Sequence, residues 1–339
     1  MHRRRAIAGS VAVLVLLAAA AGAWLLWWRP AQDAQRLAAL VRSEPPAADA
    51  LTLTWFGVTA VLLRHGEDAL MIDPFFSRPP GYGPLLRNAP IAPDPQRIAE
   101  GLRQAGIGQL HGVLVSHSHY DHAMDAGAVA RRTGAMLVGS SSTLQIGRGA
   151  GLPEARLHDI AGGASLDLGP FTVRFIESRH AGATGGAPTG DIVTPLVPPA
   201  RYLDYRQGGT YSILVTHPRG TVLHHGSAGF VTGALAGVHA DTVVLGAALV
   251  EDAEAYVREV VDPVGAREVV LSHWDDFTRP LSAPLRPMPV VVNLAPLLEA
   301  LSRRSGLRVR VPALAQPIAV TPPPPSTATA APSGSRRSR

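Results

Sequence analysis

Four of the six consecutive residues in the segment His117–His122 are of types that bind metal ions. The segment reads His-Ser-His-Tyr-Asp-His, and it closely follows the apolar run Val113–Val115. Such a run predicts a buried strand, which places the histidines on the turn where the strand ends. Side chains on such a turn can converge on one ion, so the spacing favours a metal site over a polar loop that is merely rich in histidine.

Two further histidines, His180 and His273, come directly after predicted strands at 171–177 and 267–271. Three strand ends that carry histidine can meet at one edge of a β-sandwich. We therefore expect these histidines and the 117–122 segment to form one constellation. Three protein ligands would leave a coordination position open for water, as catalytic zinc requires. The chain has no Cys, so any zinc would be held by His, carboxylate and water.

The basic character of the chain is concentrated at its two ends. All 31 positive side chains are Arg, with 6 in residues 1–44 and 3 in the last four residues. The part between them, residues 45–335, carries 22 Arg against 24 acidic residues and is nearly neutral. This distribution does not support a nucleic-acid-binding surface.

Residues 1–30 predict a membrane anchor or a signal segment. The uncharged stretch Ala6–Trp28 would span about 34 Å as a helix, slightly more than the roughly 30 Å hydrocarbon core of a bilayer. Arginines precede this stretch, and three tryptophans cluster at its far end. This arrangement favours an uncleaved anchor with the catalytic domain on the periplasmic, extracytoplasmic side. In the alternative, the Ala-x-Ala pattern at 21–23 is cleaved and the protein is secreted.

The rest of the chain divides into a linker at 31–50, a domain at 51–315 and a tail at 316–339 that is rich in Pro, Ala, Ser and Thr and is expected to be disordered. The domain reads as two successive halves in which strands precede helices, so its class is α/β, as two packed sheets with helices outside would require. Asp94 and Pro95 predict the start of a helix. Two long loops, 74–93 and 181–209, begin at strand ends and are expected to border the metal site.

Together these motifs resemble the metallo-β-lactamase-fold hydrolases over roughly residues 51–312. The resemblance rests on Ile72-Asp73-Pro74, the His-rich segment, His180 and Leu271-Ser272-His273, in this order and spacing. The opening segment, from Trp55-Phe56-Gly57 to Asp73, is similar to the branch of ascorbate-6-phosphate lactonases and N-acyl-phosphatidylethanolamine phospholipase D. The resemblance implies a four-layer αββα sandwich. It also implies two metal sites, the first held by His117, His119 and His180 and the second by Asp121, His122 and His273.

One position departs from the family pattern. Most members have an aspartate that bridges the two metals, in a turn where this chain has Ser227. A neutral hydroxyl is a poor bridge, so the second site is expected to bind its ion more weakly. His225 or Asp276 would be candidates to compensate, although His224 and His225 are expected to make ordinary hydrogen bonds. Asp276 and its neighbour Asp275 are expected to support ligands or to cap a helix, and Asp73 is a further candidate site residue.

The expected function is an exported metal-dependent hydrolase in which a metal-bound hydroxide cleaves an ester, lactone, amide or phosphodiester. Asp121 would be both ligand and proton acceptor, with one or two zinc ions, or Mn or Fe in their place. The substrate would be a small or lipid-like molecule, and Arg201 and Tyr202 would recognise an anionic group on it. Two alternatives stay open, a metal-binding sensor without turnover and a β-lactam hydrolase.

Overall fold

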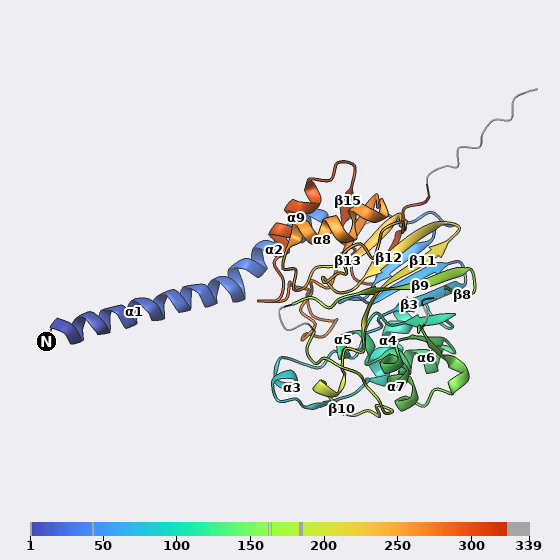
Figure 1. Ribbon diagram of the computed structural model, residues 1–339, viewed down its shortest axis with the longest axis horizontal. Helices are drawn as coiled ribbons and strands as arrows, with labels where there is room; N and C mark the ends of the chain where they lie inside the picture. Colours follow the sequence, from blue (N-terminus) through green and yellow to red (C-terminus); the bar gives the residue numbers. More distant parts are fainter. Residues whose placement is uncertain (1, 43, 162, 164, 183–185, 324–339) are drawn as a thin grey trace, which may run out of the picture.

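Two seven-stranded sheets form the centre of the fold (Figure 1). The computed structural model describes residues 2–42, 44–161, 163, 165–182 and 186–323. The first sheet has the order β16 (Pro317–Ala319), β1 (Thr52–Trp55), β2 (Val61–His65), β3 (Asp68–Ile72), β5 (Gly112–Leu114), β6 (Met136–Gly139) and β7 (Leu157–Asp159). The second has the order β15 (Arg308–Arg310), β14 (Glu268–Ser272), β13 (Thr242–Gly246), β12 (Gly220–His225), β11 (Thr210–His217), β9 (Phe171–Ser178) and β8 (Leu166–Leu168).

Helices cover the outer face of each sheet. The first sheet packs against α4 (Pro95–Gln104), α6 (Ala126–Thr133) and α7 (Ser141–Gly149). The second packs against α8 (Ala253–Val260) and α9 (Leu294–Ser302). The expected four-layer αββα sandwich is therefore confirmed (Figure 1).

The alternation of side chains along β3 illustrates how the sequence produces these layers. Leu70 and Ile72 join the core between the two sheets, whereas Met71 joins the core between the first sheet and its helices. Successive residues of a strand point to opposite faces, so a continuous apolar run buries both faces of a central strand. The helix predicted at Asp94 is also present, because the Asp94 carboxylate accepts from the backbone N–H of Gln96 and Arg97 at 2.9 and 3.2 Å.

The N-terminal segment is helical from α1 (His2–Ala23) through η1 (Trp24–Trp28) to α2 (Arg29–Leu40). Within it, Ser10–Leu40 is long and apolar enough to cross a membrane, judged by length and composition. The expectation of a linker from residue 31 is corrected in part. Leu37 is buried in the main core, and the Asp33 carboxylate accepts from the backbone N–H of Leu294 in α9, so α2 is docked onto the domain.

The expected start of the tail at residue 316 is wrong. Residues 317–319 form β16, which pairs antiparallel with β1 at the edge of the first sheet. Ile318 and Val320 are buried, and the Thr321 hydroxyl donates to the buried Glu268 carboxylate at 3.0 Å. The domain therefore extends at least to this point, and the part of the predicted tail from 324 to 339 lies outside the described residues.

The two long loops pair with each other through a short strand in each. The 74–93 loop contains α3 (Gly83–Leu86) and β4 (Pro90–Ile91), and the 181–209 loop contains β10 (Ala200–Arg201) and η3 (Tyr202–Asp204). Strands β4 and β10 form a small antiparallel sheet. The loops therefore support one another instead of extending separately into solvent.

Candidate metal centre

The expected ligands come together where strands of both sheets end. His117 follows β5 of the first sheet, and His119, Asp121 and His122 begin or lie in the short helix α5 (Tyr120–Ala123). His180 follows β9 and His273 follows β14, both in the second sheet. The expected ligands in and around α5 therefore meet His180 and His273, which follow strands of the second sheet.

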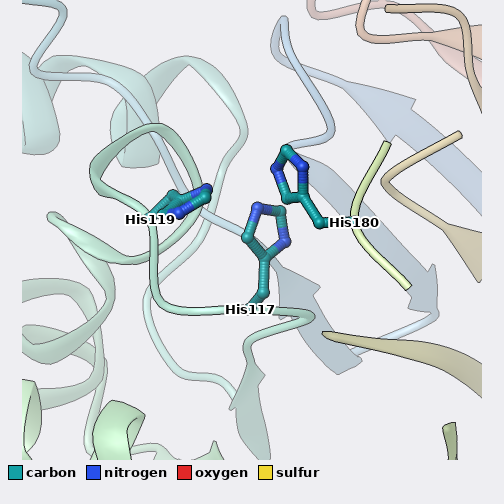
Figure 2. Close-up of side chains that lie close together, drawn as sticks. All are labelled: His117, His119 and His180. Atoms are coloured by element: carbon teal, nitrogen blue, oxygen red, sulfur yellow. The ribbon is translucent and has the colours of Figure 1, made fainter. Parts of the chain in front are cut away.

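His117, His119 and His180 form the first group. Each offers a ring nitrogen, and these nitrogens all lie within 4.8 Å of one another. The three rings face a common point, with ring centroids 4.8 to 4.9 Å apart (Figure 2). The Nδ1 atom of His180 is paired with the backbone oxygen of Ala181 at 2.7 Å, which leaves its Nε2 atom available as a ligand.

Asp121, His122 and His273 form the second group, also within 4.8 Å. The Asp121 carboxylate lies 3.6 Å from Nε2 of both histidines. The two groups are adjacent, because the rings of His117 and His122 are 3.9 Å apart between centroids. Two ions held by these groups would lie side by side, as in two-metal hydrolytic sites.

Asp73 lies directly behind His122 and orients it. Its Oδ2 atom is 2.9 Å from His122 Nδ1, and it accepts from the hydroxyls of Thr59 and Ser116 at 2.9 and 2.6 Å. Such a carboxylate fixes the histidine tautomer so that Nε2 faces the metal. Burial opposes ionisation of Asp73, but the charge of His122 and the hydrogen bond to it outweigh burial and lower the pKa of this carboxyl.

Most histidines of the centre are held in the neutral form that binds metal. Burial, followed by the nearby charge of His180, lowers the pKa of His119 to about 4. Burial, followed by His122, lowers the pKa of His273 to about 4 as well. The pKa of His122 is instead raised, because the charges of Asp121 and Asp73 outweigh the effect of burial. The ligand nitrogens of His119 and His273 therefore need to lose no proton at neutral pH before an ion binds.

A buried ion pair holds the backbone of His273. The guanidinium of Arg78, from the 74–93 loop, donates to Asp275 at 2.6 Å, and both side chains are buried. The same carboxylate accepts from the backbone N–H of Val58, whose own carbonyl accepts from the N–H of His273 at 2.6 Å. His273 and Val58 both have a positive φ, of 53° and 49°. This conformation is unfavourable for such residues, so the surrounding contacts determine where His273 points.

Ser227 and His225 make hydrogen bonds that serve the loop around His180. The Ser227 hydroxyl accepts from the N–H of Ala181 at 2.9 Å. The His225 ring pairs with the Ser212 hydroxyl at 2.7 Å and the Gly229 carbonyl at 2.9 Å. Both ring nitrogens of His225 are therefore already hydrogen-bonded. His225 belongs to neither of the two ligand groups.

Asp276 and Arg201 lie in supporting contacts, whereas Tyr202 reaches the centre. Asp276 accepts from Thr278 and from Arg286, at 2.7 Å in each case, in a turn and not at a helix start. Arg201 is exposed, and its backbone N–H donates to Asp204. Tyr202 packs its ring on Tyr120 with centroids 4.9 Å apart, and burial raises the pKa of its phenol to about 12.

A pocket of about 230 Å³ is lined by residues of both groups. Its polar floor contains His119, Asp121, His180, Ser227 and His273. Its walls are mainly apolar or aromatic and come from several loops: Leu85, Tyr120, Ala181, Ala187, Tyr202, Ala248, Leu249, Phe277, Met288 and Val291. Both long loops contribute to these walls, as expected from the sequence.

The donor set fits a metal ion. Among the described residues, His117 Nε2 and His273 Nδ1 are buried and have no hydrogen-bond partner. A buried polar atom without a partner costs free energy, and an ion bound at the first group would satisfy His117. Nitrogen and carboxylate ligands in groups of three match zinc or another divalent transition metal.

Sequence reasoning missed the residues that support the ligands. Thr59, Ser116 and Arg78 are common polar types that no metal-ligand motif includes, and only their position in the fold connects them to the metal centre. The apolar pocket wall was missed for the same reason, because Phe277 and Met288 lie in a segment with no clear periodicity.

The fold and the site agree with comparisons to known proteins. The family model of the metallo-beta-lactamase superfamily matches residues 53–272, which is most of the domain. The chain belongs to this superfamily.

Individual relatives are more distant. A UPF0173 metal-dependent hydrolase of Pyrobaculum islandicum is 27% identical over 180 residues, covering 53% of this chain and 62% of that protein. One from Chelativorans sp. is 28% identical over 131 residues, covering 39% and 49%. The chain thus matches only about half to three fifths of these relatives. The structure of Igni18, a metallo hydrolase from Ignicoccus hospitalis, is 15% identical with a TM-score of 0.51, covering 79% of this chain and 97% of that one, and shows a similar fold.

Proposed function

We propose that this chain is a metal-dependent hydrolase that cleaves an ester, lactone, amide or phosphodiester. The observation that carries the proposal is the pair of adjacent ligand groups, each with its ligand atoms within 4.8 Å, at the floor of a pocket with apolar walls. His117, His119 and His180 would hold one ion, and Asp121, His122 and His273 the other. Zinc is the metal that this donor set favours, with Mn or Fe as alternatives.

The bound metal would supply the Lewis acidity that makes water a nucleophile near neutral pH. The residues of the chain would do the rest. Asp121 lies between His122 and His273 at the pocket floor, where its carboxylate would accept a proton from the attacking water. Tyr202 would donate a hydrogen bond to a substrate oxygen, because its phenol stays protonated at physiological pH. The apolar walls would exclude water and accept a nonpolar part of the substrate.

We further propose that the N-terminal helix anchors the protein in a membrane, with the domain on the extracytoplasmic side. The helix Ser10–Leu40, which is long and apolar enough to cross a membrane, supports anchoring, and the arginines that precede it support this orientation. Protease digestion would test the orientation. An extracytoplasmic domain should resist added protease in intact cells and become degraded once the outer membrane is permeabilised.

The hydrolase proposal is tested by metal content and turnover together. The full chain in detergent is reconstituted with Zn²⁺ or Mn²⁺, and bound metal is counted by mass spectrometry. Turnover is screened with p-nitrophenyl acetate, bis(p-nitrophenyl) phosphate, a γ-lactone and a chromogenic β-lactam. We expect up to two ions per chain and hydrolysis of at least one substrate class. His119→Ala should lose about one ion and abolish turnover, whereas His239→Ala, at a side chain that is 61% exposed, should change neither.

Two results would count against this function. Full metal loading without hydrolysis of any class would indicate a metal-binding protein without turnover. No bound metal after reconstitution would contradict the metal centre itself. A single ion per chain, raised to two by Ser227→Asp, would show that the missing aspartate bridge weakens the second site.

A further inference from the structure

Exposed aliphatic side chains lie in the segments that line the metal-site pocket. Leu86 is 85% exposed, Val290 59%, Leu203 46% and Leu249 41%. Leu249 lines the pocket itself, and the other three are the sequence neighbours of the lining residues Leu85, Val291 and Tyr202. These four residues, Leu86, Leu203, Leu249 and Val290, are called the apolar rim below.

The apolar rim comes from four separate parts of the chain. Leu86 ends α3, Leu203 lies in η3, and Leu249 and Val290 lie in loops that are joined by the hydrogen bond from Leu249 N–H to the Val291 carbonyl at 3.0 Å. Exposed aliphatic side chains scattered singly need no explanation, but several of them in the segments that line one pocket point to an interaction site.

The backbone presents two of these side chains at a conformational cost. Leu249 and Val290 have φ angles of 59° and 67°. A β-branched residue such as Val290 rarely adopts this conformation, and strain of this kind collects at functional sites. Both side chains are exposed, so their burial within the domain does not offset the free-energy cost of this backbone conformation.

The position of the membrane helix indicates what covers the apolar rim. Along the long axis of Figure 1, α1 projects from the same end of the domain at which α3, with Leu86, lies. Helix α2 joins α1 to the domain and is docked there through Leu37 and Asp33, so this orientation is set by packing. A bilayer that α1 crosses would therefore face the end of the domain that carries α3.

Charges near the apolar rim are of both signs. Arg87 and Arg201 are exposed and adjoin Leu86 and Tyr202 in sequence. Asp204 directly follows Leu203, Glu251 is two residues after Leu249, and both are exposed. A mixed set of charges does not select an anionic surface. The aliphatic side chains would therefore supply the attraction, and contact with a zwitterionic bilayer is expected.

We propose that the apolar rim rests in the interfacial layer of the bilayer that α1 spans, so that the metal-site pocket opens at the membrane surface. This inference rests on the proposed membrane anchoring, and it adds that the substrate is an amphiphile that reaches the pocket from the lipid. An apolar pocket wall that continues into an apolar rim suits a substrate with a hydrocarbon part.

The absence of cysteine allows a direct test, because a single introduced cysteine is the only labelling site. Leu86→Cys and Val290→Cys are each labelled with bimane in the full chain and reconstituted into phosphatidylcholine vesicles that contain doxyl-labelled lipid. The matched control is Val197→Cys. Val197 is 65% exposed but lies against α7, where its neighbour Leu196 donates a backbone hydrogen bond to Gln145.

We expect doxyl lipid to quench the two rim labels at least about threefold more than the Val197→Cys label, with little dependence on salt. Equal, weak quenching at all three positions would overturn the proposal. Rim labels that are shielded from water but not quenched by lipid would show that a second copy of the chain covers the rim, and would also overturn it. Failure of the chain to float with vesicles would overturn the anchoring and this inference together. The turnover assay in detergent would not be affected, so the hydrolase proposal would be judged separately.

Discussion

At the scale of single residues, three of the expected ligands have a partner that holds them in place. His122 is oriented by Asp73, His180 by the carbonyl of Ala181, and His273 by the backbone contact with Val58. Ser227 takes part in the same support by accepting from Ala181. Ser227, at the position where the resemblance implies a bridging aspartate, therefore supports the loop that carries His180.

Asp73→Asn should weaken metal binding at the second group. The amide carries no charge to favour the metal-binding tautomer of His122, so affinity for the second ion should fall about 10- to 100-fold. Zinc titration against a chelating dye, which separates the two binding steps, measures this change. Asp68→Asn, at the opposite end of β3 and partly exposed, should leave both steps unchanged. Equal weakening of both steps would show that Asp73 supports the whole fold and not His122 in particular.

At the scale of elements, the 74–93 loop is tied to the helices beside the metal centre. Asp125 precedes α6, but its side chain does not cap that helix; its Oδ2 atom accepts from the backbone N–H of Phe76 and Ser77 at 2.7 and 2.8 Å. Its other oxygen, Oδ1, is buried without a partner among the described residues. Burial raises the pKa of this carboxyl from 3.8 to about 6.

This raised pKa predicts a pH dependence of stability. Between pH 4 and 6 the unfolded chain releases the Asp125 proton before the folded chain does, so the folded state loses stability as the pH rises. Relative to Asp125→Asn, the wild type should lose up to ~3 kcal/mol over this range. Urea unfolding of both proteins at several pH values measures the difference. A constant difference between the two proteins would show that the pKa of Asp125 is not raised.

At the scale of the whole molecule, the two ends of the chain complete the sandwich. Helix α2 packs on α9, and β16 adds a strand to the edge of the first sheet beside β1. The segment after β16 also reaches the second sheet, where the Thr321 hydroxyl donates to Glu268. Segments that precede and follow the part matched by the family model, residues 53–272, therefore pack onto the domain.

Truncation should locate this boundary. A chain that ends at residue 323 keeps β16 and should unfold like the full chain. A chain that ends at residue 315 exposes the edge of β1 and loses the burial of Ile318 and Val320, which should cost about 3 to 6 kcal/mol. Thermal unfolding of the two truncations compares them directly. Similar unfolding temperatures would show that β16 adds little to the fold.

The sequence by itself determined the elements and the ligand types. Apolar runs predicted the strands that carry the site, and Asp94 predicted the start of α4 because a side-chain cap acts within one helical turn. The six residues that the structure brings together as expected ligands were also named from the sequence, because each follows a strand or lies in one dense motif. Such signals are local, so they can be read without knowledge of the fold.

Only the tertiary structure decided what surrounds the ligands. Arg78 and Asp275 are 197 positions apart, and Thr59 meets Asp73 and His122 only because β-sheet packing brings their segments together. The same holds for β16, whose Pro-rich surroundings resemble a disordered tail until its pairing with β1 is seen. A hydrogen bond or a strand pair between distant segments depends on the path of the whole backbone, and that path cannot be inferred from local composition.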